Sequence, residues 1–290
     1  MELFVNNLTV IDFSYLDIKR GLVGESLIVD ITLRGELDHQ SMVMDFSKVK
    51  KDIKKYIDET IDHAVVIPWD SHQISYFSSG LAAEVTLHTD EGKVDCYVSG
   101  PVKSFCPIDS MTINRDVLEK WLTTRINAIM PANIEGVSVS LREEHVGGHY
   151  YHYAHGLKKH EGNCQRIAHG HRSAIRIFID GQRHASWEMF WAERWRDCYL
   201  MSEEDVIVDL SKLSSGAQKI ANEKLIASAY TSSQGRFEIL IKHGRVEILP
   251  YDTTIERIAR YINQEMLYMQ PDLSNVVVHA FEGIEKGAIV

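Results

Sequence analysis

Hydrophobic residues at every second position mark the first predicted strand of the chain. Leu27, Val29, Ile31 and Leu33 follow this pattern, which is typical of a half-buried β-strand. After a turn at Arg34-Gly35, apolar residues recur at helical spacing with lysines around them. They predict a helix that ends near Thr60 and buries Val49, Ile53, Tyr56 and Ile57.

The rest of the first half continues with a hairpin, a helix and a strand. Residues 84–88 and 94–98 flank Asp90-Glu91-Gly92, a sequence that favours a hairpin turn. A second helix is predicted from about 115 to 129. The strand at 137–141 closes this half and ends at Glu143.

The second half of the chain repeats this order of elements. Ile175, Ile177 and Ile179 match the first strand, and Val206 to Leu210 is expected to open a helix that runs to about Leu225. A strand at 237–241 follows, and the capping-box spacing from Thr253 to Glu256 predicts a helix through about Met266. The strand at 276–280 leads to Glu282. Two imperfect copies, 1–147 and 148–290, therefore cover nearly the whole chain.

One segment, 184–204, has no counterpart in this alignment and is interpreted as an insertion in the second copy. It is rich in aromatic residues, which either form a flap beside a site or pack in a buried hairpin or helix. Packing is favoured, because aromatic side chains usually pack. The residues are Trp187, Phe190, Trp191, Trp195 and Tyr199.

Composition narrows the classes of protein that fit. The 290 residues are 44% hydrophobic, enough for one large domain or two ordinary ones. The net charge of −10 argues against general nucleic-acid binding, and no apolar run approaches the roughly 20 residues that cross a bilayer. The four cysteines lack CxxC spacing, which indicates reduced thiols in a cytoplasmic protein: Cys96, Cys106, Cys164 and Cys198.

Seven of the 14 histidines lie between His145 and His171. His169 and His171 are two positions apart, so on a strand their imidazoles point to the same face. His155 ends an alternating run with Tyr151 and Tyr153. If the two strands pair, three imidazoles converge and leave a fourth position open, which is the ligand set of a catalytic zinc. The alternative is a histidine-rich surface loop that binds metal only by accident.

Three motifs in this segment carry a resemblance to a known family. Tyr-x-Tyr-Ala-His-x-Leu, Gly-Asn-Cys and His-Gly-His resemble the zinc segment of the 6-pyruvoyl-tetrahydropterin synthase and 6-carboxytetrahydropterin synthase family. The resemblance implies that His155, His169 and His171 bind zinc and that Cys164 is catalytic. It also implies an α+β chain of two tandem T-fold (tunnelling-fold) domains, each an antiparallel four-stranded sheet with two helices on one face.

Ile61-Asp62-His63 resembles the Leu-Asp-His motif whose aspartate and histidine transfer protons with the family's cysteine. The alternative is a histidine stabilised by the dipole at a helix C-terminus. Aligning the copies on Gly24 and Gly170 puts Val23 and Glu25 at the positions of His169 and His171, and Ser14 or a neighbour at that of His155. The first copy therefore lacks the zinc set. The second copy, with Ile226–Ala229 at the place of Asp62-His63, lacks the pair.

The resemblance implies further substrate contacts. Glu282 stands where the family binds the pterin ring with a glutamate, and Glu143 is its counterpart in the first copy. A carboxylate can accept two hydrogen bonds from such a ring. Glu256 matches a second family glutamate, although it can equally cap its helix. Four cations are candidates for holding a triphosphate tail, with ordinary surface solvation as the alternative: Lys158, Lys159, Arg166 and Arg172.

The function implied is that of a zinc-dependent lyase acting on the small molecule 7,8-dihydroneopterin triphosphate. A 6-carboxytetrahydropterin-synthase-like activity is favoured over a 6-pyruvoyl-tetrahydropterin-synthase-like one, because the loop between Cys164 and His169 is compact. A non-catalytic pterin- or purine-binding T-fold protein is the alternative, and the loss of Cys164 or His63 would have been its signature. A homo-oligomer is expected, with Cys164 and His63 drawn from different chains.

Overall fold

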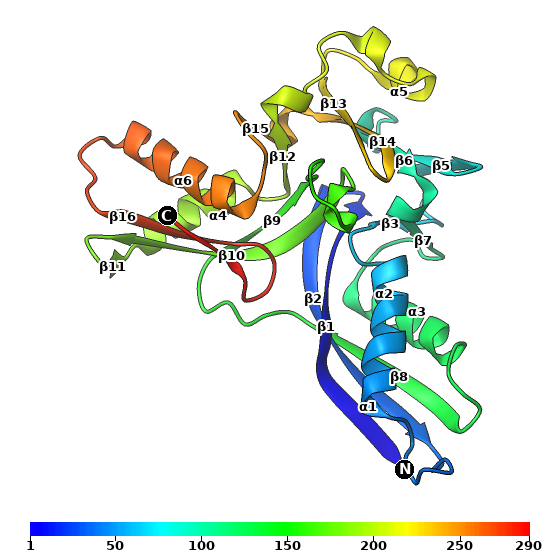
Figure 1. Cartoon of the computed structure of the whole chain (residues 1–290). Helices are drawn as coiled ribbons and strands as arrows, with labels where there is room; N and C mark the ends of the chain where they lie inside the picture. Colours follow the sequence, from blue (N-terminus) through cyan, green and yellow to red (C-terminus); the bar gives the residue numbers. More distant parts are fainter.

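The computed structural model describes residues 1–290, which form two domains joined by residues 143–149 (Figure 1). Two long antiparallel strands, β1 (Glu2–Asp17) and β2 (Gly21–Gly35), are the centre of the first domain. They belong to a five-stranded sheet of order β7-β3-β1-β2-β8. The other three strands are β3 (Val65–Pro68), β7 (Phe105–Ile108) and β8 (Ile134–Arg142).

Two helical segments cover one face of this sheet. The first is continuous and carries a π-helical stretch, and the second is a single α-helix. Val49, Ile53 and Ile57 of the first segment pack in the same core as Leu122 of the second, which confirms the predicted apolar stripe. The segments are α1 (Phe46–Lys48), η1 (Val49–Ile53) and α2 (Lys54–Thr60), and then α3 (Arg115–Asn127).

The second domain repeats this plan in a sheet of order β15-β12-β9-β10-β16-β17, with β11 beside β10. In both domains the strand that follows the first helical segment runs parallel to the first strand, β3 to β1 and β12 to β9. The prediction of two tandem α+β T-fold domains is confirmed, with larger and partly parallel sheets. The strands are β9 (Tyr150–His155), β10 (His169–Ile179), β11 (Gln182–Arg183), β12 (Cys198–Ser202), β15 (Val246–Leu249), β16 (Val276–Phe281) and β17 (Gly287–Ile289), and the helices are α4 (Ala185–Arg194) and α6 (Ile255–Met269).

A third sheet joins the two domains. Its order is β13-β14-β6-β5-β4, and β14 of the second domain pairs with β6 of the first. The predicted hairpin around Asp90-Glu91-Gly92 is confirmed as β5 and β6. The strands are β4 (Ile74–Ser79), β5 (Ala82–His88), β6 (Val94–Pro101), β13 (Leu225–Ser232) and β14 (Gly235–Lys242).

Two predictions for the second domain are wrong. The helix expected from Val206 to Leu225 is only η5 (Leu210–Lys212) and α5 (Ser215–Ile220), because the following residues enter β13 of the joining sheet. The segment 184–204 is not an insertion, since it contains α4, which stands where the first domain has α1 to α2. Trp191 and Trp195 are fully buried, so the packing interpretation of this segment is correct.

Short 3-10 turns complete the chain: η2 (Val102–Ser104), η3 (Asn163–Gln165), η4 (Glu203–Asp205) and η6 (His243–Arg245). No helix has the length and apolar character needed to span a membrane.

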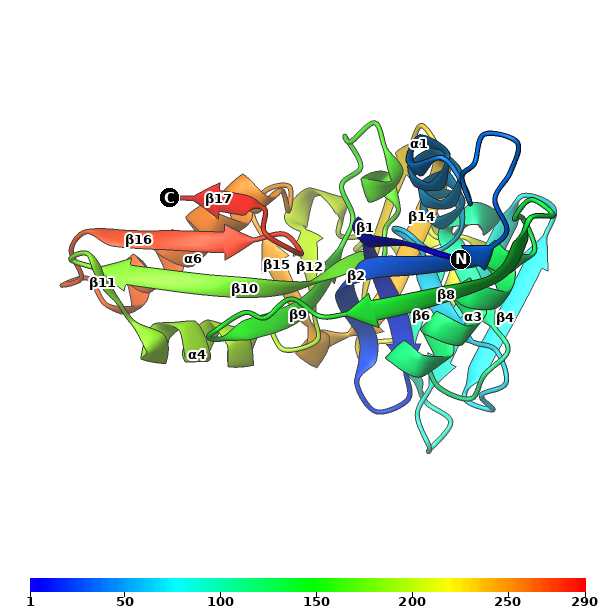
Figure 2. The same cartoon turned by 90° about the horizontal axis from the view of Figure 1, so that it is seen from below.

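The two domains cross where β2 passes over β10 (Figures 1 and 2). Gly24 and Gly170 lie at the crossing, and a Cβ on Gly170 would be 2.5 Å from the Cα of Gly24. His152 Nδ1 donates a hydrogen bond to the Gly24 carbonyl at 2.7 Å, and Ser14 Oγ donates one to the Ala168 carbonyl. Backbone therefore meets backbone here, and a side chain at either glycine would hold the sheets apart.

Replacing Gly24 by alanine should destabilise the protein, because the added Cβ would overlap the Tyr153 carbonyl oxygen and lie 2.6 Å from the His171 nitrogen. We expect a loss of roughly 2 kcal/mol or more in the free energy of unfolding, measured in urea. Gly244→Ala is the control, since no atom lies within 4 Å of a Cβ there. Equal stability of the two variants would contradict the close contact at the crossing.

Candidate functional site

Strand pairing brings three histidines together. In the antiparallel β9–β10 pair, His155 lies opposite His169, and His171 lies opposite Tyr153. All three histidines are buried, and each offers a ring nitrogen within 4.8 Å of the others. The predicted convergence of the three imidazoles is therefore present in the structure.

Each imidazole is held through its Nδ1 atom. His155 Nδ1 donates to the Thr253 carbonyl and His169 Nδ1 to the Arg166 carbonyl, both at 3.0 Å. His171 Nδ1 lies 3.2 Å from Asp12 Oδ1. The three Nε2 atoms are buried and have no hydrogen-bond partner, and His171 Nδ1 has only the contact with Asp12.

Burial and the neighbouring histidines lower the pKa of His155 and of His169 well below the ordinary value. Neutral imidazoles present lone pairs, and a buried lone pair without a partner costs free energy. A bound cation removes that cost, and three imidazole nitrogens suit zinc. These residues therefore fit a metal. A second possible ligand set, which shares His169, contains His63 and Cys164.

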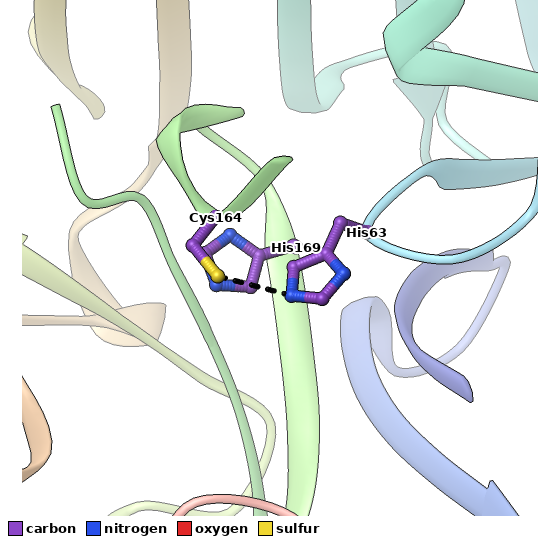
Figure 3. Close-up of side chains that lie close together, drawn as sticks. All are labelled: His63, Cys164 and His169. Atoms are coloured by element: carbon purple, nitrogen blue, oxygen red, sulfur yellow. Dashed lines mark hydrogen bonds between the residues drawn. The ribbon is translucent and has the colours of Figure 1, made fainter. Parts of the chain in front are cut away.

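Cys164 lies in the turn η3, next to His63 of the first domain (Figure 3). Its Sγ is 3.2 Å from His63 Nε2, and His63 Nδ1 donates to Asp62 Oδ2 at 2.6 Å. Backbone bonds fix this pair, because His63 N donates to the Asp12 carbonyl and Asp62 Oδ1 accepts from Asp12 N at 3.0 Å. The sequence correctly grouped these three residues.

The environment of His63 favours its protonated form. Burial lowers its pKa, but hydrogen bonds to Asp62 and Cys164 outweigh this effect and raise the pKa to about 10. A histidine that keeps its proton at neutral pH is placed to pass it to a neighbouring group and take it back.

Asp62 and His63 follow α2 in the first domain, whereas Cys164 comes from the second, and all three belong to one chain. The expectation that Cys164 and His63 come from different chains is therefore wrong for this pair. The physical reason is the crossing at Gly24 and Gly170, which lays the end of α2 against η3.

The sequence alignment of the copies is made definite at one position and corrected at another. Tyr15, the neighbour of Ser14, stands at the position of His155, because Tyr15 pairs with Val23 as His155 pairs with His169. The counterpart of Asp62-His63 is Arg196-Asp197 after α4, not Ile226–Ala229, which lies in β13. Asp197 and His63 even share a positive φ, 54° and 56°. The inference that the second copy lacks an Asp-His pair still holds.

The three candidate glutamates lie in different places. Glu282 follows β16, and its charge adds to burial in raising the pKa of Tyr153, whose ring lies 5.3 Å from that of His171. Glu143 Oε2 is 3.4 Å from Arg172 Nη2, on the other side of the crossing. Glu256 is exposed in the first turn of α6. Which glutamate binds substrate stays a prediction.

The four candidate phosphate-binding cations do not converge. Lys158 pairs with Asp205 and Glu204, and Lys159 with Glu204 and Asp252. Arg166 donates to the Asp62 carbonyl at 3.2 Å, and Arg172 donates to the Glu144 carbonyl at 3.1 Å. Acidic neighbours therefore neutralise both lysines, and the two arginines support backbone.

Sequence reasoning missed Asp12 and the role of Thr253. Asp12 is 3% exposed in β1, accepts a hydrogen bond from Ser26 Oγ and lies 3.1 Å from Lys286 Nζ. Burial raises its pKa, but His171 and Lys286 lower it below the ordinary value overall. The sequence signal that could have identified Asp12 is its carboxylate within a mostly apolar strand. The predicted capping box from Thr253 is wrong, because Thr254 stands at the N-cap position of α6 without a side-chain capping bond, and the Thr253 hydroxyl lies 3.1 Å from His155 Nδ1.

The family model for 6-pyruvoyl tetrahydropterin synthase matches the chain twice, at residues 20–148 and 145–289. A catalytic-residue mutant of the Plasmodium vivax 6-pyruvoyltetrahydropterin synthase is 17% identical, and the match covers 49% of this chain and 90% of that one with a TM-score of 0.39. The Plasmodium falciparum enzyme is 15% identical, with the same coverage and TM-score. A comparison with curated protein sequences found no match.

The two family matches together span the chain from residue 20 to residue 289, one in each domain. They agree with the repeated order of strands and helices. The chain therefore belongs to the 6-pyruvoyl tetrahydropterin synthase family and contains two tandem copies of the family's domain.

Proposed function

We propose that this protein is a zinc-dependent lyase acting on 7,8-dihydroneopterin triphosphate or a close relative. One observation carries the proposal. Three buried Nε2 atoms without partners converge beside a cysteine that contacts an aspartate-bound histidine, in a member of a pterin lyase family. Neither feature alone would indicate a lyase, because metal sites and Cys-His pairs each serve many reactions.

His155, His169 and His171 hold the metal in this proposal, with their rings oriented by Thr253 and the other partners of the Nδ1 atoms. Zinc bound there would supply a Lewis acid for the hydroxyl groups of the substrate side chain. Glu282 binds the pterin ring through its carboxylate, with Glu143 and Glu256 as the weaker candidates.

Cys164 removes a proton from the substrate side chain and returns one during the reaction. His63 exchanges that proton with the sulfur across the 3.2 Å contact. Asp62 keeps the imidazole in position and stabilises its charged form through the 2.6 Å hydrogen bond, the role of a carboxylate in a catalytic triad.

The proposed reaction predicts a defined product. Incubation of the zinc-loaded protein with 7,8-dihydroneopterin triphosphate, followed by mass spectrometry, should yield acetaldehyde, free triphosphate and a carboxypterin. We favour this 6-carboxytetrahydropterin-synthase-like outcome because the loop from Cys164 to His169 is compact. Loss of triphosphate with a pyruvoyl product would select the 6-pyruvoyl-tetrahydropterin-synthase-like reaction. No turnover, with binding of the compound retained, would favour a non-catalytic pterin-binding protein.

The ligand assignment predicts one zinc per chain. Elemental analysis should find zinc in the His63→Ala protein and none in the His155→Ala protein, because only the latter belongs to the three-histidine set. This pair of variants separates that set from the overlapping one formed by His63, Cys164 and His169. Zinc that is lost from His63→Ala but kept in His155→Ala would place the metal in the other set.

Mixing two inactive variants tests whether one chain builds the site. His63→Ala and Cys164→Ala should each lose most turnover, because residues that act as a unit fail together. We propose that the protein is a homo-oligomer, because the edge strands of its sheets are bare. A stable monomer, found by light scattering after gel filtration, would contradict this proposal. When the variants are refolded together, activity should stay absent, since each site takes both residues from one chain. Recovered activity would show that sites form across chains.

A further inference from the structure

The crossing at Gly24 and Gly170 creates two corresponding places at the interface between the domains, one on each side of the crossing. The metal candidates occupy one of them. At the other, the residues in register with His155, His169 and His171 are Tyr15, Val23 and Glu25. This place has therefore lost the histidines.

The two places are built by reciprocal contacts. Asp12 of the first domain reaches His171 of the second, with Oδ1 3.2 Å from Nδ1. Conversely, His152 of the second domain reaches Glu25 of the first, with Nδ1 3.8 Å from Oε2. The pairs match in strand register, because Asp12 lies opposite Ser26 and His152 lies opposite Arg172.

The second place is hollow. A cavity of about 330 Å³ opens between the domains there, and its polar walls come from both of them. The polar residues that matter for a ligand are Arg20, Glu25, Glu143, His152 and Arg172, together with the ring of Tyr150.

Two hydrogen-bond acceptors in this cavity have no protein partner. Glu25 Oε1 accepts from Ser26 N at 3.0 Å, while no donor bonds to its Oε2. His152 Nδ1 donates to the Gly24 carbonyl, so its Nε2 is the acceptor nitrogen. Burial lowers the pKa of His152 to about 4 and raises that of Glu25 to about 7. The histidine is therefore neutral at neutral pH, Glu25 is near its titration midpoint, and both side chains are free to accept hydrogen bonds from a ligand whose donors would favour the ionised carboxylate.

The cavity also carries a flat cationic surface. Arg172 stacks on Tyr150 with its guanidinium carbon 3.9 Å from the ring centroid, and its Nη1 donates to the Glu144 carbonyl. Arg20 is held by two hydrogen bonds to Asp197, at 3.0 and 2.6 Å. These contacts fix a planar wall against which an aromatic ring can stack.

We propose that this cavity is a second binding site, independent of metal, for a planar aromatic heterocycle with N–H donors, such as an amino-oxo pteridine or purine. The volume is that of a small-ligand pocket, and the free acceptors match the donors of such a ring. The site binds without turnover, because the position of His63 is taken by Asp197, which Arg20 neutralises. The occupied cavity would stabilise the crossing on which the metal site depends.

Binding stoichiometry of the full-length, zinc-loaded protein tests this proposal. The probe is 2-amino-4-oxopteridine, which has no side chain to react, titrated by calorimetry and by its fluorescence. We expect two sites per chain in the native protein and one in Glu25→Leu. In the isosteric Glu25→Gln, the second site should weaken roughly tenfold or more, since a charge-assisted hydrogen bond is lost.

Glu135→Leu, at an exposed salt bridge with Arg34, is the matched control and should keep both sites. The Glu25 variants should also keep the zinc content of the native protein, which shows that they fold. One site per chain that is unchanged in both Glu25 variants would overturn the second site alone. If the native protein binds one probe per chain and Glu25→Leu binds none, the second site is supported, and binding of the pterin at the metal is contradicted. No binding at all would overturn both.

Discussion

The site depends on the close contact between the backbones of Gly24 and Gly170. Because neither residue has a side chain, two sheets meet closely enough for polar groups of one domain to reach those of the other. His152 Nδ1 then donates to the Gly24 carbonyl, and Ser14 Oγ donates to the Ala168 carbonyl, next to the metal candidate His169. Packing at one point of contact thus sets the position of groups that are far apart in the sequence.

Asp12 shows how this contact couples the domains. Its backbone holds Asp62 and His63, and its carboxylate lies against His171. One residue of β1 therefore fixes both the proton-transfer pair and the orientation of a metal candidate. A histidine that binds a metal depends on the partner of its other ring nitrogen for its tautomer, so the first domain would contribute to the proposed metal site without providing a ligand.

Much of this arrangement was predictable from local patterns in the sequence. The alternation that ends at His155 and the His-Gly-His spacing predicted that three imidazoles converge, because strand geometry fixes the direction of side chains, and the resemblance placed Asp62 and His63 with Cys164; the structure brings both groups together. The order of elements in the second domain was harder. Trp187, Trp191 and Trp195 recur every four residues, which is a helical spacing. The segment was nevertheless interpreted as an insertion, because its aromatic residues have no counterparts in the first copy. The joining sheet was not predictable, since β14 and β6 lie far apart in the sequence and no local pattern marks them as a pair.

A tandem copy that crosses itself produces two equivalent places, and the two have diverged in a complementary way. At one, three imidazoles converge, and a protonated His63 and Cys164 lie beside the imidazole of His169. At the other, Asp197 replaces His63, and an Arg20 guanidinium satisfies its charge within the protein. A buried carboxylate without that partner would be costly, so the ion pair stabilises the second place without a histidine that could carry a proton. The proposed chemistry therefore has its residues at one place per chain, while the geometry of both places is kept, because they share the same crossing.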